Sequence, residues 1–231
     1  MVSVIVPCRT PNEASNCRKH LNLLDRQDIE ILVMHDGITG PVSPAKKRNI
    51  GIQKAKGDLI AFIDSDAYPH KYWLNYVVQG VAGWCGPGLI PPKSPPREVA
   101  SDWILNCLPF NYRVSKKKER FVTDFPTFNL IIKKSVLEKL GGFKEDTLTG
   151  EDSDLCQRIT DLGLKIVYIP WCIVYHKRRA LFLSFLKQIA TYAMHRGYFF
   201  RINRGSSRKV VYLLPSICLL FILYLVFRLL F

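Results

Sequence analysis

Two carboxylates one residue apart form the first candidate site in this sequence. Leu59 to Ile63 is an unbroken apolar run that follows Gly57-Asp58 and ends in Asp64-Ser65-Asp66. Such a run predicts a buried central strand, and ligands of open α/β sheets bind at the carboxyl ends of their strands. Two hard oxygen ligands there suit Mg²⁺ or Mn²⁺, which substrate phosphates usually complete. The pattern alone has two interpretations, a site for a metal and a nucleotide diphosphate or a solvated turn. Other motifs in the chain must decide between them.

The elements that must position these carboxylates alternate between strands and helices. Strands are predicted at 2–6, 30–34 and 59–63, with a helix over 45–56 between the last two. This alternation predicts an α/β fold built on a parallel, right-handed βαβ sheet. No Gly-x-Gly-x-x-Gly follows the first strand and no Walker-type motif is present, which disfavours an ordinary dehydrogenase or a P-loop enzyme.

The second half of the chain continues the α/β pattern after a long irregular stretch. A helix is predicted over 69–81, with Pro69 in its first turn, and residues 84–125 are expected to be mostly loops around one short helix. Further elements are predicted as a strand at 127–133, helices at 135–140 and 151–162, strands at 164–169 and 173–176, and an amphipathic helix within 180–200.

The composition excludes several classes of protein. Seven cysteines without a Cys-x-x-Cys pair argue against a disulfide scaffold and a structural zinc site, so reduced thiols in a cytosolic domain are expected. The formal net charge is +14, but residues 1–176 carry 23 basic and 19 acidic residues, a charge of only +4. From Lys177 onward there are ten Lys and Arg residues and no Asp or Glu, so the basicity is local.

The basic C-terminal region leads into an apolar segment. Val210 to Phe227 is 18 residues without a charge, near the lower limit of about 17–25 for a spanning helix. Residues 210–231 are therefore predicted to be a membrane anchor, with a buried core helix as the alternative. Residues 180–209 are predicted to lie at the interface, or else to pack on the core. The positive-inside rule then places residues 1–209 in the cytoplasm, with no cleaved signal peptide. An anionic membrane surface is the expected partner, and nucleic acid is not.

Several short motifs occur in order along the chain: Val2 to Pro7, Val33-Met34-His35-Asp36-Gly37, Lys46 to Gly51, Ala55 to Asp66, Leu140-Gly141-Gly142-Phe143 and Gly150 to Leu155. Together they resemble the inverting family-2 glycosyltransferases with the GT-A fold, over about residues 2–180. The resemblance implies a Rossmann-like nucleotide-sugar-binding domain over residues 1–179, followed by the interfacial segment 180–209 and the anchor 210–231.

The resemblance implies that the first half of the sheet binds a nucleotide-sugar donor. Asp66 would ligate Mn²⁺ or Mg²⁺ directly, and the metal would act as a Lewis acid on the diphosphate. His176 matches a position that completes the metal shell in some GT-A enzymes, with a structural histidine as the alternative. Either His35 or Asp36 could contact the base, and Lys46 to Arg48 could instead be a solvated face. The implied donor-binding residues are Pro7, Cys8, Arg9, Asp36, Lys46, Arg48, Asn49, Asp64, Ser65 and Asp66.

The pair Glu151-Asp152 matches the family motif whose aspartate deprotonates the acceptor hydroxyl. Asp152 is thus implied to be the general base, and Glu151 would orient the acceptor. Asp154 is interpreted as a cap or packing residue. The structural alternative is that all three acids only cap a helix.

These observations favour a membrane-anchored, metal-dependent inverting glycosyltransferase that acts on a hydroxyl of a membrane-held acceptor. The expected donor is GDP-mannose or a UDP-sugar, and the expected acceptor is a lipid-linked saccharide. A polyprenyl-phosphate glycosyltransferase is the alternative within enzymes, and Asp152 argues against it because an ionised phosphate needs no base. A non-catalytic, membrane-tethered module that binds nucleotides or lipids is the alternative from another class.

Overall fold

The computed structural model describes residues 1–107, 118–145 and 150–201, with the single residues 217, 224 and 228. Within these ranges a seven-stranded sheet has the order β2-β1-β3-β8-β5-β9-β7, and a small sheet has the order β4-β10-β6. The strands are β1 (Val2–Pro7), β2 (Ile29–Met34), β3 (Leu59–Phe62), β4 (Ala67–Pro69), β5 (Gly83–Cys85), β6 (Gly88–Leu89), β7 (Arg120–Val122), β8 (Leu130–Lys133), β9 (Ile166–Tyr168) and β10 (Val174–His176). The α-helices are α1 (Ser15–Leu21), α2 (Asp36–Thr39), α3 (Pro44–Lys54), α4 (Pro96–Cys107), α5 (Lys134–Leu140), α6 (Glu151–Asp161) and α7 (Leu183–Arg201), with 3-10 turns η1 (Pro11–Ala14) and η2 (Thr127–Asn129).

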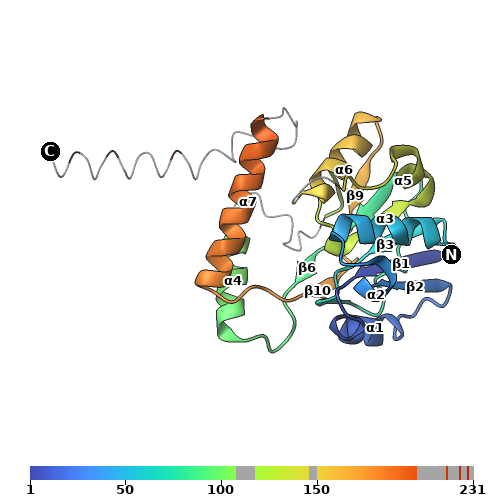
Figure 1. The fold of residues 1–231 in the computed structure, drawn as a ribbon, viewed down its shortest axis with the longest axis horizontal. Helices are drawn as coiled ribbons and strands as arrows, with labels where there is room; N and C mark the ends of the chain where they lie inside the picture. The colour runs from blue at the N-terminus through green and yellow to red at the C-terminus, as the bar shows by residue number, and fades with distance from the viewer. Residues whose placement is uncertain (108–117, 146–149, 202–216, 218–223, 225–227, 229–231) are drawn as a thin grey trace.

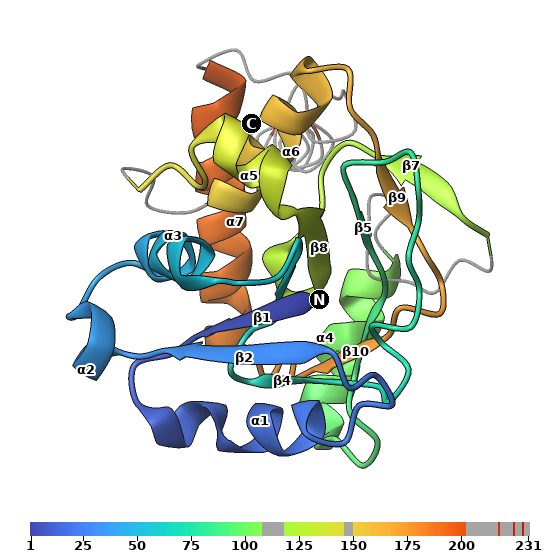
Figure 2. The same ribbon diagram turned by 90° about the vertical axis from the view of Figure 1, so that its right-hand side faces the viewer.

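Strand β1 lies at the centre of the parallel part of the sheet. All six of its residues are buried, and it pairs in parallel with both β2 and β3. Helices α3 and α1 cover opposite faces of these strands (Figure 2). Helix α3 approaches β1 at Gly51, where a Cβ atom would lie 2.8 Å from the Ile5 side chain. The predicted strands and helices of this half are confirmed to within two residues.

The other half of the sheet is mixed, so the parallel arrangement predicted from the first three strands holds for β2, β1 and β3 and does not extend across the whole sheet. Strand β8 runs antiparallel to both β3 and β5, with Phe62 opposite Leu130 and Cys85 opposite Leu130 on its other side. The predicted strand at 127–133 begins only at Leu130, because η2 precedes it. Asn129 is the last residue of this turn. Its side-chain amide donates to the carbonyl oxygens of Pro87 and Cys172 at 3.2 and 2.7 Å. The apolar run therefore predicted a strand at this place, but not the antiparallel direction of β8, which depends on contacts with distant parts of the chain.

The helix predicted over 69–81 was also wrong. Pro69 ends strand β4, which pairs antiparallel with β10, and the next residues form turns. The indole of Trp73 is fully buried and donates to the Asn129 side-chain oxygen at 2.8 Å. Tertiary pairing thus overrides the local helix signal of Pro69, because the segment pairs with a strand more than 100 residues away along the chain.

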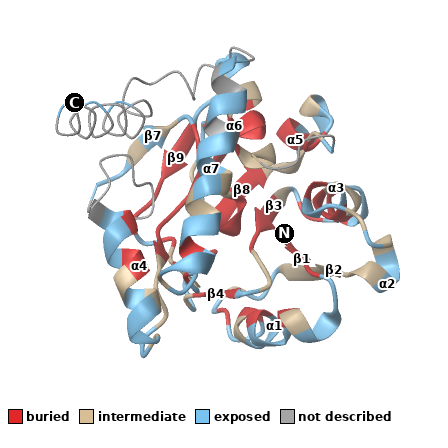
Figure 3. Ribbon diagram, turned by 60° about the vertical axis from the view of Figure 1, so that its left-hand side comes forward, coloured by how far each residue is buried: buried red, intermediate tan, exposed pale blue. Residues whose placement is uncertain are grey.

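Helices α4 and α7 lie together at one side of the sheet (Figure 1). Arg178 joins them, because its buried guanidinium binds the Asp102 carboxylate of α4 at 2.5 Å just before α7 begins. Most of α7 is exposed (Figure 3). Among the described residues no helix is long and apolar enough to cross a membrane. Apart from residues 217, 224 and 228, the predicted anchor lies outside the described residues.

Candidate active site

The carboxylates after β3 meet a histidine from β10. Register pairing places His176 opposite Ala67, which brings its imidazole next to the turn after β3 although 110 residues separate it from Asp66. Candidate ligand atoms of Asp64, Asp66 and His176 all lie within 4.8 Å of one another. The His176 Nε2 atom is 3.1 Å from Asp66 Oδ1, and its ring stacks on Phe128 at 4.9 Å between centroids.

This donor set fits a divalent cation. Two carboxylates and one imidazole suit Mn²⁺ as ligands, whereas Mg²⁺ would be bound chiefly by the carboxylate oxygens. Burial, the largest single influence, raises the pKa of the Asp66 carboxyl, but the hydrogen bond and charge of His176, together with a backbone hydrogen bond and the charge of Arg179, lower the pKa overall. Asp66 is therefore ionised at neutral pH, as metal ligation requires. Ser65 lies in the same turn, between the two carboxylates.

The three candidate metal ligands, Asp64, Asp66 and His176, are called the metal cluster below. A buried arginine links them to the second acidic motif. Arg48 of α3 is 4 % exposed, and its Nη2 atom binds Asp64 Oδ1 at 3.0 Å. Its Nη1 atom binds Glu151 Oε1 at 2.9 Å, and Glu151 is the first residue of α6. Two guanidinium nitrogens thus hold the end of β3 and the start of α6 together, with charge-assisted hydrogen bonds on both sides.

The helix that begins at Glu151 carries the candidate base. The Asp152 carboxylate accepts a hydrogen bond from the Ser153 amide at 2.8 Å, and the Ser153 hydroxyl donates to Asp124 Oδ1 at 2.8 Å. Burial, followed by the nearby charges of Glu151 and Asp124, raises the pKa of Asp152 to about 7. A carboxylate with that pKa can accept a proton near neutral pH and still be partly ionised.

Asp154 has a structural role, as expected. Its side chain is buried and forms ion pairs with Arg158 at 2.6 Å and Lys144 at 3.3 Å. Arg158 also donates to the carbonyl oxygens of Leu140 and Gly142, so this group fastens α6 to the end of α5. The three acids of the motif therefore have different places: Glu151 pairs with Arg48, Asp152 is the candidate base, and Asp154 packs the helix.

The loops after β1 and β2 meet at a buried lysine. Lys47 Nζ lies 2.5 Å from Asp36 Oδ1 and donates to the carbonyl oxygen of Cys8 at 2.6 Å. His35 instead accepts from the Gly37 amide and caps α2. Since Lys47 and Arg48 are both buried, the alternative of a solvated basic face was wrong for these two residues. Lys46 alone remains half-exposed, 3.9 Å from the Glu145 carboxylate.

The other predicted donor-binding residues occupy different parts of the same edge. Pro7 is the last, buried residue of β1, and exposed Arg9 forms an ion pair with Glu13 at 2.7 Å. The Asn49 amide exchanges hydrogen bonds with the backbone of Phe143, at 2.8 Å in each direction. In this structure Arg9 and Asn49 therefore make protein contacts that hold loops in place.

Two candidate site residues, Lys47 and Asp124, were not predicted from the sequence. Lys47 and Arg48 both fall on the buried side of α3 with Ala45, Gly51 and Ile52. Charged residues at core-facing helix positions must be paired, so this spacing was the available signal for Lys47. Asp124 carries no such signal, because it lies in an irregular stretch and reaches Ser153 only through the fold.

Comparisons with known proteins identify the chain's family. The family description "Glycosyl transferase family group 2" matches residues 59–231. The chain belongs to this family. A pre-mycofactocin glycosyltransferase of Mycobacterium tuberculosis is 26% identical over 221 residues, which cover 83% of this chain and 46% of that protein. Glycosyltransferase AglE of Haloferax volcanii is 27% identical over 241 residues, covering 90% and 77% of the two chains. The chain thus spans about half the length of its mycobacterial relative.

Solved structures give this family-2 chain the GT-A fold. The mannosyltransferase PcManGT from Pyrobaculum calidifontis, in complex with GDP-Man and Mn²⁺, superposes with a TM-score of 0.65 at 16% identity. That match covers 91% of this chain and 67% of PcManGT. TarS of S. aureus with UDP-GlcNAc gives a TM-score of 0.52 at 17% identity, covering 80% and 60%. At these identities the likeness establishes the fold alone.

Proposed function

We propose that this chain is a metal-dependent, inverting glycosyltransferase that moves one sugar from a nucleotide-sugar onto a hydroxyl group. The observation that carries the proposal is the buried Arg48, which bonds to a carboxylate of the metal cluster and to the neighbour of the candidate base. One side chain thereby couples a cation site for the donor to a carboxylate whose pKa is about 7. GDP-mannose or a UDP-sugar is the proposed donor, in line with the ligands of the two structural relatives.

In this mechanism the residues of the chain bind, orient and accept a proton. Asp64, Asp66 and His176 would hold the cation, which when bound offsets the charge on the departing nucleoside diphosphate. The acceptor hydroxyl oxygen attacks the anomeric carbon on the face opposite the diphosphate, the bond to the diphosphate breaks, and the hydroxyl proton passes to Asp152. Arg48 forms an ion pair with Glu151, so that Asp152 remains the carboxylate of this pair that can take the proton.

The proposed donor orientation follows the order of the loops along the sheet edge. The Cys8 carbonyl, Asp36 and Lys47 form one polar cluster at the ends of β1 and β2, where the nucleoside would bind. The metal cluster follows at the end of β3. The diphosphate would therefore bridge the two clusters and leave the sugar beside the start of α6.

The acceptor is proposed to be a lipid-linked saccharide held at the membrane, with the catalytic domain on the cytoplasmic side of a single-pass anchor. Support comes from α7, whose exposed side chains include Leu183 at 85 %, Met194 at 71 % and Leu186 at 60 %. The region from Lys177 onward contains basic residues but no acidic ones. An apolar surface with only positive charge suits an anionic lipid interface.

The direct test of activity is metal-dependent release of nucleoside diphosphate from a panel of GDP- and UDP-sugars. The full chain is mixed with Mn²⁺ and membrane lipid extract, and the glycosylated product is identified by mass spectrometry. Transfer from one donor is expected, with loss in EDTA and in Asp66→Ala. Asp58→Ala is the matched control, because Asp58 precedes the same strand and its side chain is 94 % exposed. Metal-independent binding without transfer from any donor would contradict the proposal.

Membrane attachment is tested separately by flotation with vesicles. The full chain should float with neutral and anionic vesicles at any salt concentration, because residues 210–231 would span the bilayer. A chain ending at residue 209 should float only with anionic vesicles and only at low salt, since surface charges are screened beyond about 10 Å at 0.1 M salt. A shortened chain that ignores anionic vesicles at low salt would assign residues 180–209 to the core.

A further inference from the structure

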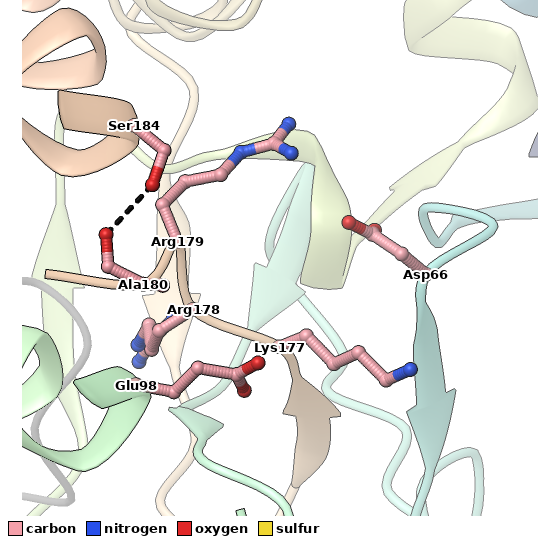
Figure 4. Close-up of a pocket in the computed structure, with 7 residues that line it drawn as sticks. All are labelled: Asp66, Glu98, Lys177, Arg178, Arg179, Ala180 and Ser184. Carbon is pink, nitrogen blue, oxygen red and sulfur yellow. Dashed lines mark hydrogen bonds between the residues drawn. The ribbon is translucent and has the colours of Figure 1, made fainter. Parts of the chain in front are cut away.

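A pocket of about 300 Å³ lies between the metal cluster and the α4–α7 pair. One wall is Asp66, and another is Glu98 of α4 (Figure 4). The remaining lining comes from Lys177 to Ala180 and from Ser184 in the first turn of α7. The pocket therefore connects the proposed cation site directly to the two exposed helices.

The backbone beside this pocket is firmly held. Arg178 is 6 % exposed and binds Asp102 of α4 at 2.5 Å and the carbonyl oxygen of Gly88 at 2.7 Å. The Ser101 hydroxyl donates to the carbonyl oxygen of Arg179 at 2.7 Å. Along this extended segment Arg178 lies beside Glu98, whereas Lys177 and Arg179 extend to the side of the pocket where Asp66 lies, one on either side of its carboxylate (Figure 4). Lys177 and Arg179 are thus placed on the pocket side by a fixed backbone.

The two cations on the pocket side are available for a ligand. Lys177 and Arg179 are exposed, and in the described ranges neither lies within ion-pair distance of a carboxylate, although the charge of Arg179 contributes to lowering the Asp66 pKa. The pocket's own carboxylates are Glu98 and Asp66, and Asp66 belongs to the proposed metal cluster. A cation bound there would offset the Asp66 charge and leave the pocket net positive. Lys177 and Arg179 are long, exposed side chains on one backbone segment, and both can turn to a phosphate bound between them, which Arg can bind in a bidentate manner.

The position of the pocket indicates which molecule carries that phosphate. The nucleoside cluster of Lys47 and Asp36 lies at the ends of β1 and β2, whereas α4 and α7 lie at the opposite side of the domain (Figure 1). The two helices expose large apolar side chains, among them Trp103 of α4 at 71 % and Leu183 of α7 at 85 %. A ligand that enters from this side would have its phosphate in the pocket, an apolar part over α4 and α7, and its sugar directed toward the donor sugar and Asp152.

We propose that Lys177 and Arg179 bind a phosphate group of the acceptor, so that the acceptor is a saccharide linked to a prenyl phosphate or diphosphate. The inference rests on the proposed function, because it identifies the acceptor class of the same reaction. The acceptor's phosphate acts as a handle, and the reacting hydroxyl belongs to its sugar. No bond to this phosphate forms or breaks.

The test measures binding of farnesyl diphosphate, a short prenyl diphosphate, to the full chain in detergent by calorimetry. The variant is Lys177→Gln with Arg179→Gln. The matched control is Arg18→Gln with Lys54→Gln, which removes the same charge from exposed positions on α1 and α3. Farnesol, inorganic diphosphate and GDP or UDP with Mn²⁺ serve as comparison ligands for both variants.

The variant should bind farnesyl diphosphate about 10- to 100-fold more weakly than the native chain, since two charge-assisted contacts are lost. The control should bind it within two-fold, and nucleoside diphosphate affinity with Mn²⁺ should be unchanged in both. Equal weakening in the control, unchanged farnesyl diphosphate binding, or selective loss of nucleoside diphosphate binding would each overturn the proposal. The last result would assign the pocket to the donor.

The outcome is separable from that of the proposed function, because binding needs no turnover. A chain that transfers sugar but binds farnesyl diphosphate independently of Lys177 and Arg179 retains the function and loses this subsite. A chain that transfers nothing but binds farnesyl diphosphate through these residues retains the phosphate site, while the glycosyl transfer is refuted.

Discussion

Replacing Asp152 with Asn should remove activity and stabilise the protein at the same time. Asn has nearly the same shape and keeps an oxygen to accept the hydrogen bond from the Ser153 amide, but it cannot take the acceptor's proton. Loss of a positioned general base lowers kcat by about 10²–10⁴-fold. Donor affinity should change little, because the metal cluster does not include Asp152.

The stability gain follows from the raised pKa of Asp152. The folded protein raises the pKa from 3.8 to about 7, so ionising this carboxylate opposes folding at every pH above about 4. The cost grows between about pH 4 and 7 and is constant at higher pH. At 1.36 kcal/mol per pKa unit it reaches at most about 4 kcal/mol. Asn avoids this cost and should raise Tm at pH 8 by up to about 8–16 °C, since 1 kcal/mol corresponds to roughly 2–4 °C for a domain of this size.

The assay combines thermal melts of the metal-free chain at pH 4 and pH 8 with single-turnover transfer. Asp161→Asn is the control, because Asp161 is an exposed residue at the far end of the same helix; it should leave both Tm and turnover nearly unchanged. A Tm at pH 8 that is equal to or lower than the native value would refute the burial argument. Native-like transfer by Asp152→Asn would refute the base, and would indicate an acceptor that is already ionised, such as a polyprenyl phosphate.

Three further predictions concern Arg48, His176 and Asp152. Arg48→Gln leaves two carboxylates unpaired and should cost roughly 3–5 kcal/mol in urea unfolding, part of which Mn²⁺ should restore; unchanged stability would contradict the bridging role. His176→Ala should weaken Mn²⁺ binding more than Mg²⁺ binding in calorimetry, because imidazole favours transition metals, and equal losses would show that His176 is not a ligand. The pH profile of kcat should rise with an apparent pKa near 7, owing to Asp152, and should level off above it; a flat profile between pH 6 and 8 would exclude this titration.

The sequence predicted the half of the fold built on β1, β2 and β3 well, because its signals are local. The apolar runs of β1 and β3 and the turn residues between them determine strands whose neighbours follow along the chain. Asp64 and Asp66 were found for the same reason, because they immediately follow a strand. His176 was proposed only from the resemblance, and the pairing of β10 with β4 is what brings it to Asp66.

The remainder depended on contacts that sequence patterns do not reveal. Pro69 signals a helix start locally, but pairing with β10 makes it the end of a strand. Arg48 was assigned to the donor from its motif, whereas its two carboxylate partners come from segments 16 and 103 residues away. The effect of Asp124 on Asp152 likewise exists only in the folded chain.

The configuration of the new glycosidic bond tests the central claim most directly. The donor selected from the panel is supplied with ¹³C at its anomeric carbon, and the product is followed by NMR from the first minutes of the reaction. A single displacement assisted by Asp152 predicts a product with the anomeric configuration opposite to that of the donor, and formation of this product that depends on Mn²⁺. A product that retains the donor configuration would contradict the mechanism.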